Sequence, residues 1–157
     1  MIRAPRLASI LVGLWIFGPF AMAQPAPEGG ATTVELTLVG GPELNPNSQG
    51  RPSPVVVRIF DLIAPNAFEA ADFATLFEHP ESLKRDLLAQ EELVLRPGDV
   101  QERNRDLKAN VRNLGVAVAF RDMDRAVWRL TVPVKPGRRN FLLLHLDQNK
   151  IRLETIE

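Results

Sequence analysis

The stretch Thr33-Val-Glu-Leu-Thr-Leu-Val39 alternates polar and apolar residues from Thr33 to Leu38. Val34, Leu36 and Leu38 would share one side of an extended chain, and the polar residues between them the other side. Because successive side chains of a strand point to opposite faces, this pattern is typical of a strand that is buried on one face only. The first strand of the fold is therefore predicted over residues 33–39.

Seven further segments downstream have the composition of strands. Pro, Gly, Asn or Asp clusters separate several of them, at residues 96–99, 122–124, 135–137 and 148–150. The predicted strands cover residues 55–62, 92–96, 100–107, 113–121, 126–134, 140–147 and 151–156. Eight short strands at this spacing predict an all-β fold, an antiparallel β-sandwich.

One segment, residues 66–90, interrupts the strand pattern. It is rich in Ala, Leu and Glu, which favour helices. Asn66 and Glu69 have the spacing of a capping pair, Pro80 is expected to end the first helix, and Ser82 is expected to cap a second one. The sequence thus predicts a helical insert of two short helices over residues 66–90, packed on one sheet or at one end of the sandwich.

The N-terminal part of the chain has the pattern of a secretory signal. Arg3 and Arg6 precede a 14-residue apolar run, residues 7–20, and small residues at Ala21 and Ala23 suit cleavage before residue 24. As a helix the run would rise about 21 Å, which is short of a hydrocarbon core of about 30 Å. We therefore predict a signal peptide over 1–23, a flexible Pro- and Gly-containing tether over 24–31, a sandwich domain over 32–157 and a periplasmic location.

Composition removes several classes of function. The 157 residues include no cysteine, which removes disulfides, thiolate metal sites and a Cys nucleophile. The 19 basic and 19 acidic residues balance, whereas nucleic acid binding needs a basic face. The two histidines, His79 and His145, belong to no metal-binding motif, and no nucleophile elbow or phosphate loop occurs. We expect no catalysis, no cofactor, no metal and no nucleic acid partner.

Four basic residues, Arg103, Arg105, Lys108 and Arg112, gather around the predicted strand 100–107 among acidic neighbours. A solvated strand edge that discourages pairing with other chains is the favoured interpretation. A binding patch is the alternative.

The connection between the first two predicted strands is unusually long. Residues 40–53 (GGPELNPNSQGRPS) make 14 residues, whereas hairpin loops normally have two to five. Three prolines restrict its backbone and cannot donate hydrogen bonds to a sheet. A stiffened loop loses less entropy when it binds, so recognition of a partner is one interpretation, and a loop packed on its own domain is the other.

An ordered series of short motifs resembles the TssJ family, the outer-membrane lipoproteins of bacterial type VI secretion systems. The motifs are 44–46 (LNP), 50–62 (GRPSPVVVRIFDL), Phe68, 71–73 (ADF), Leu76, 86–88 (DLL), 97–98 (PG), 114–122 (LGVAVAFRD) and 128–129 (WR). They cover the chain from about residue 44 to residue 133, in family order.

The resemblance implies a transthyretin-like sandwich of eight strands with a helical insertion, in agreement with the strand count. It also implies a structural role, in which the protein binds the periplasmic domain of the inner-membrane protein TssM at the outer membrane, in a complex completed by TssL. In that family the first interstrand loop is a contact surface for TssM, which corresponds here to Leu44, Asn45, Pro46, Asn47 and Arg51. Deletion of residues 45–51 is expected to weaken TssM binding and to leave the thermal stability nearly unchanged.

The resemblance fails at the lipid anchor. Members of the family carry an acylated Cys after a lipobox, whereas this chain reads Ala21-Met-Ala-Gln24. Without acyl chains most of the intrinsic membrane affinity is lost. A periplasmic protein held at the outer membrane by its partners is the favoured explanation; a separate lipoprotein anchor, an uncleaved signal and a different start codon are the others.

Two other functions remain possible for such a sandwich. A periplasmic module could bind carbohydrate or peptide, but the sequence after residue 23 has one Trp and no Tyr to stack on sugars. A transthyretin-like hydrolase would need clustered His and Arg, and the two histidines lie far apart in the sequence.

Overall fold

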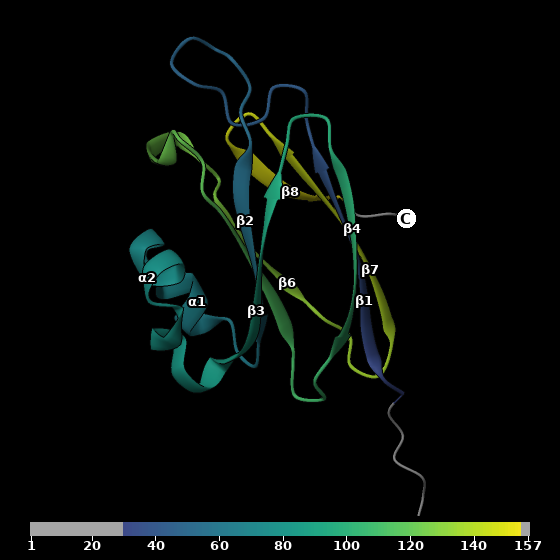
Figure 1. The fold of residues 1–157 in the computed structure, drawn as a ribbon. Helices are drawn as coiled ribbons and strands as arrows, with labels where there is room; N and C mark the ends of the chain where they lie inside the picture. The colour runs from purple at the N-terminus through teal and green to yellow at the C-terminus, as the bar shows by residue number, and fades with distance from the viewer. Residues whose placement is uncertain (1–29, 155–157) are drawn as a thin grey trace, which may run out of the picture.

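The fold is a β-sandwich of two four-stranded sheets, as predicted (Figure 1). The computed structural model describes residues 30–154. The predicted signal peptide and most of the predicted tether lie outside these residues. The strands are β1 (Thr32–Gly40), β2 (Val55–Leu62), β3 (Leu87–Leu95), β4 (Val100–Leu107), β5 (Asn113–Val118), β6 (Arg129–Pro133), β7 (Arg139–Asp147) and β8 (Lys150–Glu154).

The strand order is β4-β1-β7-β8 in one sheet, here called sheet A, and β3-β2-β5-β6 in the other, sheet B. All pairs are antiparallel except β1 with β7, which run parallel. The expectation of a purely antiparallel sandwich is therefore corrected at this one pair. β1 lies between β4 and β7. It pairs in parallel with β7 because the chain runs along both strands in the same direction.

Alternating side chains of the strands form the core between the sheets. In β1, Val34, Leu36 and Leu38 are fully buried while the residues between them are half-buried, which is the pattern that the sequence predicted. They pack with apolar residues of sheet B such as Val57 and Ile59. Because burial of apolar surface is the main stabilising contribution, this cluster holds the two sheets together.

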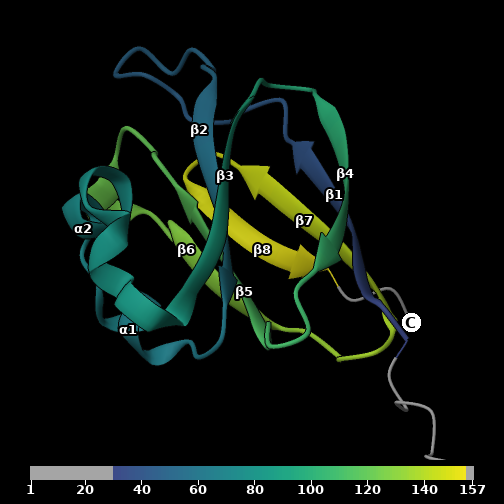
Figure 2. The same cartoon turned by 60° about the horizontal axis from the view of Figure 1, so that its bottom comes forward.

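The helical insert covers the outer face of sheet B (Figure 2). It consists of α1 (Asn66–Ala70), α2 (Phe73–Glu78) and a 3₁₀ segment, η1 (Pro80–Asp86). In the described part of the chain no helix is long and apolar enough to cross a membrane.

Several details of the predicted insert are wrong. No side chain caps α1, which begins after Pro65, whereas Asp72 caps α2 by accepting a hydrogen bond from the Thr75 amide at 2.8 Å. Hydrogen bonding from Thr75 also lowers the pKa of the Asp72 carboxyl. The expected second helix after Ser82 is a kinked 3₁₀ segment, and the insert ends at residue 86 because residue 87 already pairs with β2.

Two arginines of sheet B fasten the short helices to it. The Arg58 guanidinium donates to the carbonyl oxygens of Leu76 at 3.0 Å and Phe77 at 2.7 Å, near the C-terminus of α2. Arg129 donates to the carbonyl oxygen of Ala71 at 2.5 Å, just after α1. The last carbonyls of a helix lack intrahelical partners and carry partial negative charge, so a cation stabilises each end.

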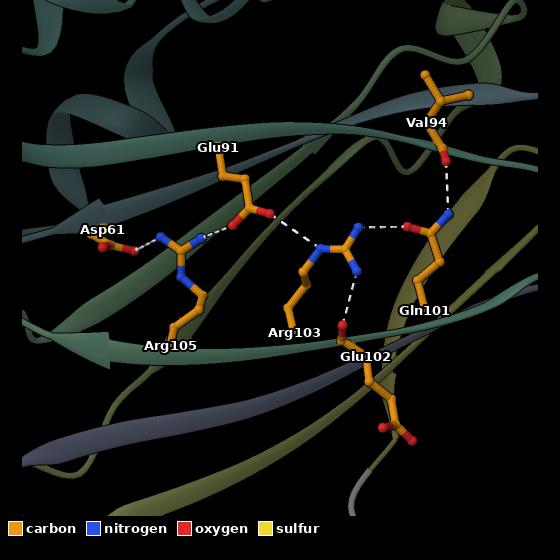
Figure 3. A network of polar contacts seen from close by, with 7 residues as sticks. All are labelled: Asp61, Glu91, Val94, Gln101, Glu102, Arg103 and Arg105. Carbon is orange, nitrogen blue, oxygen red and sulfur yellow. Dashed lines mark hydrogen bonds and ion pairs between the residues drawn. The ribbon is translucent and has the colours of Figure 1, made fainter.

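The open side of the sandwich between β3 and β4 is closed by ion pairs (Figure 3). Arg105 of β4 donates to Asp61 of β2 at 2.7 Å and also pairs with Glu91 of β3, while Arg103 of β4 donates to Glu91 at 3.1 Å. Since β4 belongs to sheet A and β2 and β3 to sheet B, these pairs join the two sheets. Two residues of the predicted solvated basic edge thus point inward.

Asp61 is the buried carboxylate of this network. Burial raises the pKa of Asp61, and the adjacent Arg105 guanidinium acts in the opposite direction. A buried ion pair contributes little net stability while both partners are present, but loss of one partner leaves a costly unpaired charge. The network is therefore a structural feature that depends on Arg105.

Candidate functional site

The β1–β2 loop, residues 41–54, projects from one end of the sandwich (Figure 1). The described chain enters β1 at the opposite end, at Thr32. The loop carries all five residues that the sequence singled out, and the structure assigns them different environments.

Leu44 lies inside the protein. Its side chain is fully buried in the main core cluster, and its carbonyl oxygen accepts a hydrogen bond from the Ser53 amide at 2.9 Å. This bond joins the two ends of the loop. Leu44 therefore fixes the base of the loop and presents no surface to a partner.

Asn45 is also buried, at 4% exposure, and its side-chain amide is used internally. Nδ2 donates to the carbonyl oxygen of Pro54 at 2.8 Å, and Oδ1 accepts from the Arg121 amide at 2.8 Å. The Asn45 amide donates to the carbonyl oxygen of Gln148 at 2.6 Å. Asn45 has a positive φ of 49°, which Asn tolerates better than most residues. It ties three loops together at this end of the sandwich.

The loop tip, residues 47–52, is held by its own hydrogen bonds. The Asn47 side chain accepts from the amides of Gln49 at 2.9 Å and Arg51 at 3.0 Å, and its backbone amide donates to the Arg51 carbonyl at 2.9 Å. Gly50 adopts a φ of 74°, in the left-handed region that glycine favours. The tip is thus a preformed turn and not an unstructured link.

The surface of the tip is polar and carries one cation. Ser48, Gln49 and Arg51 are exposed, whereas Pro46 and Asn47 are half-buried. The Arg51 guanidinium donates to the Gln49 side chain at 2.6 Å, and within residues 30–154 it forms no ion pair. Its charge is available to an acidic group of a partner.

Of the predicted contact residues, Arg51 is therefore well exposed and Pro46 and Asn47 partly so, while Leu44 and Asn45 support the loop from within. The expectation that deletion of residues 45–51 leaves stability unchanged is wrong, because that deletion removes the Asn45 anchor. Whether the loop binds a partner stays a prediction.

A cleft of about 820 Å³ lies beside the loop tip. The β7–β8 turn and the segment after β5 form its other walls. The lining residues are Glu43, Asn45, Pro46, Asn47, Ser48, Gly50, Arg121, Asp122, Gln148 and Asn149. Sequence reasoning did not assign Arg121, Asp122, Gln148 or Asn149 to a site. Residues 122–124 and 148–150 were recognised as turns, but no local pattern shows that these turns meet.

The cleft offers hydrogen-bonding and charged groups and no aromatic side chain. Sites for small molecules are usually lined mainly by apolar and aromatic side chains, with a few polar groups. The composition of this cleft is therefore closer to a polar protein–protein contact than to a sugar site.

Neither histidine lines the cleft. His145 is on β7 with Nε2 2.5 Å from the Glu154 carboxylate, and His79 is exposed 3.3 Å from Glu81. Residues 30–154 contain no group of three side chains suited to hold a metal ion.

Comparison with known proteins identifies relatives of this sandwich. The chain matches the family model described as type VI secretion lipoprotein, VasD, EvfM, TssJ, VC_A0113 over residues 32–149. A search of curated protein sequences gives no match.

Three solved structures share the fold along most of their length. The T6SS lipoprotein TssJ1 from Pseudomonas aeruginosa is 34% identical, with a TM-score of 0.79 over 81% of this chain and 98% of that one. A chain of a type VI membrane complex is 27% identical, with a TM-score of 0.70 over 80% and 99%. A chain of the structure named T6SS protein TssM C-terminal domain (869–1107) from EAEC is 26% identical, with a TM-score of 0.67 over 80% and 99%. The family model and the first of these relatives together show that the chain belongs to the TssJ family of type VI secretion lipoproteins.

Proposed function

We propose that this chain is a structural subunit of a type VI secretion membrane complex and that it binds the periplasmic domain of TssM through the tip of the β1–β2 loop. Family membership supports the secretion role, and two matched structures are named for the type VI membrane complex and for the TssM C-terminal domain. The preformed, exposed turn at residues 47–52 is the observation that carries the loop assignment.

The rigidity of the tip favours binding. Ordering a flexible loop on association costs conformational entropy, and a turn that is already closed by Asn47 avoids most of that cost. The side chains of Ser48, Gln49 and Arg51 then meet a partner in defined positions. The polar cleft beside them offers room for a partner segment that runs past the tip.

The geometry of β1 suits a protein that reaches inward from the outer membrane. β1 has nine residues and spans about 30 Å at about 3.3 Å per residue. The loop therefore lies about one sandwich length from the point where the described chain begins (Figure 1). We propose that partner subunits hold the chain at the outer membrane in this arrangement.

Isothermal titration calorimetry with a TssM periplasmic fragment tests the assignment. The triple variant Ser48→Ala, Gln49→Ala and Arg51→Ala keeps both Asn45 and Asn47. We expect it to bind at least about tenfold more weakly, a loss of about 1.4 kcal/mol. Arg138→Ala, an exposed arginine at the opposite end of the sandwich, is the matched control and should bind as the wild type does. Equal affinity of the triple variant and the control would refute the loop assignment.

A further inference from the structure

Exposed cations gather at the end of the sandwich where the described chain begins. The β4–β5 turn, residues 108–112, and the β6–β7 turn, residues 134–138, lie at the lower end in Figure 1, opposite the β1–β2 loop. Neither turn contains an acidic residue. The exposed cations of this basic end are Lys108, Arg112, Lys135, Arg138 and, at the start of β7, Arg139.

Hydrogen bonds hold the two turns around the start of β1. The Val134 amide donates to the carbonyl oxygen of Arg112 at 2.9 Å, which joins the turns directly. Thr32 pairs in register with Leu107, just before the first turn, and its hydroxyl accepts a hydrogen bond from the Gly137 amide of the second turn at 2.8 Å. The backbone that carries the cations is therefore fixed around the point where the chain enters the sandwich.

Most of these positive charges are not neutralised within residues 30–154. In that part of the chain Lys108, Arg112, Lys135 and Arg138 form no ion pair. The side chains of Lys108 and Arg112 donate to backbone carbonyl oxygens, which carry no full charge. Lys135 and Arg138 are hydrogen-bonded through their backbone atoms. Four cations thus remain for an anionic partner.

The carboxylates near the basic end are too few to cancel this charge. Glu35 pairs with Arg139 at 3.3 Å and neutralises that one cation. Asp106 is exposed on the outer face of sheet A, and Asp86 of η1 is half-buried and follows the exposed Arg85 in the sequence. Positive charge is therefore in excess at this end.

We propose that the basic end binds the surface of a membrane that contains anionic phospholipids. The proposed function points the β1–β2 loop toward TssM, so the basic end faces the outer membrane, and the inference rests on that orientation. Anionic headgroups attract Lys and Arg side chains within about one Debye length, about 10 Å at 0.1 M salt. Cations from two turns at one end approach a layer of phosphates together, without the shape complementarity that a protein partner requires.

Co-sedimentation of the full chain with lipid vesicles tests the proposal. The wild type should bind vesicles made of equal parts phosphatidylglycerol and phosphatidylcholine. Salt should release it, because the Debye length shortens from about 10 Å at 0.1 M to about 3 Å at 1 M. Vesicles of phosphatidylcholine alone measure any binding by the apolar residues 7–20, which does not depend on the charge of the lipid.

A pair of charge-matched variants locates the binding. Lys135→Ala with Arg138→Ala removes two exposed cations whose backbone atoms make the local hydrogen bonds. Each Lys or Arg near an anionic surface strengthens binding about fivefold, so this double variant should bind the anionic vesicles about 25-fold more weakly. Arg96→Ala with Arg125→Ala removes the same charge from exposed arginines at the loop end, and this control should bind as the wild type does.

Equal binding of the wild type to neutral and anionic vesicles, or a Lys135→Ala and Arg138→Ala variant that binds as tightly as the control, overturns the proposal. A wild type that ignores anionic vesicles also overturns it and leaves the basic end to an acidic protein. The vesicle assay contains no TssM, and Arg138→Ala should keep its affinity for TssM. A failure of membrane binding is therefore distinguishable from a failure of the proposed function.

Discussion

Replacement of Asn45 by alanine is expected to destabilise the fold although Asn45 belongs to a surface loop. The variant loses the hydrogen bonds to Pro54 and from Arg121, both at 2.8 Å, and leaves their backbone groups without this partner in a partly buried site. Each bond contributes about 1 kcal/mol and an unpaired partner adds to the loss. Alanine at a φ of 49° costs about 1 kcal/mol more.

The sum predicts a loss of about 3 kcal/mol in the free energy of unfolding, which corresponds to about 10 °C in Tm for a domain of this size. Urea denaturation followed by circular dichroism measures this free energy. Arg51→Ala, at the exposed tip of the same loop, is the matched control and should change it by less than about 0.5 kcal/mol.

The reverse pattern would refute the anchoring role of Asn45. If Asn45→Ala were as stable as the wild type while TssM binding fell, Asn45 would be a contact residue, as the sequence suggested, and not a support of the loop.

Two further changes test how the insert and the sheets are held. Gly115→Ala should cost about 1 to 3 kcal/mol, because its Cβ would lie 2.8 Å from the Phe68 ring; Phe68→Leu in the same chain should recover part of that loss in urea denaturation. Arg105→Met should cost about 3 to 5 kcal/mol at neutral pH, because it leaves the buried Asp61 unpaired and leaves Glu91 with Arg103 as its remaining partner. Burial already raises the pKa of Asp61, and loss of Arg105 raises it further. Because protonation removes the unpaired charge, the stability lost in the variant should become smaller as the pH falls through this raised pKa. A loss of stability that grows in acid would contradict this explanation.

Alternation predicted the first strand, and strand-like composition with turn signals predicted the others. The limits of β2 and β4 are as predicted, and β1 differs by one residue at each end. In β4 the side chains of Gln101, Arg103 and Arg105 alternate on the inward face, and the inward direction of these charges was not visible in the sequence. That direction depends on Asp61 and Glu91, which belong to other strands.

Long-range pairing explains where the prediction failed. Residues 87–91 have helix-forming side chains, yet they extend β3 because they pair with the end of β2. The predicted strand 126–134 is shorter, and Trp128 is half-buried between its sheet and Phe73 of α2, with ring centroids 5.7 Å apart. The parallel pairing of β1 with β7 has no local signature at all.

The candidate site was predictable as a loop but not in its detail. Its length and prolines identified residues 40–53 without any structure. The burial of Asn45 depends on Arg121 and Gln148, which lie far along the chain and come near it only in the folded sandwich. Propensity can place a turn, but it cannot show which turns meet.

Hydrogen exchange measured on the full chain, alone and with the TssM periplasmic fragment, tests the central claim most directly. TssM should slow exchange at the amides of residues 47–51 of the loop tip and at those of the cleft residues Arg121, Gln148 and Asn149. Slowed exchange confined to other surfaces, with the loop tip unchanged in a saturated complex, would contradict it.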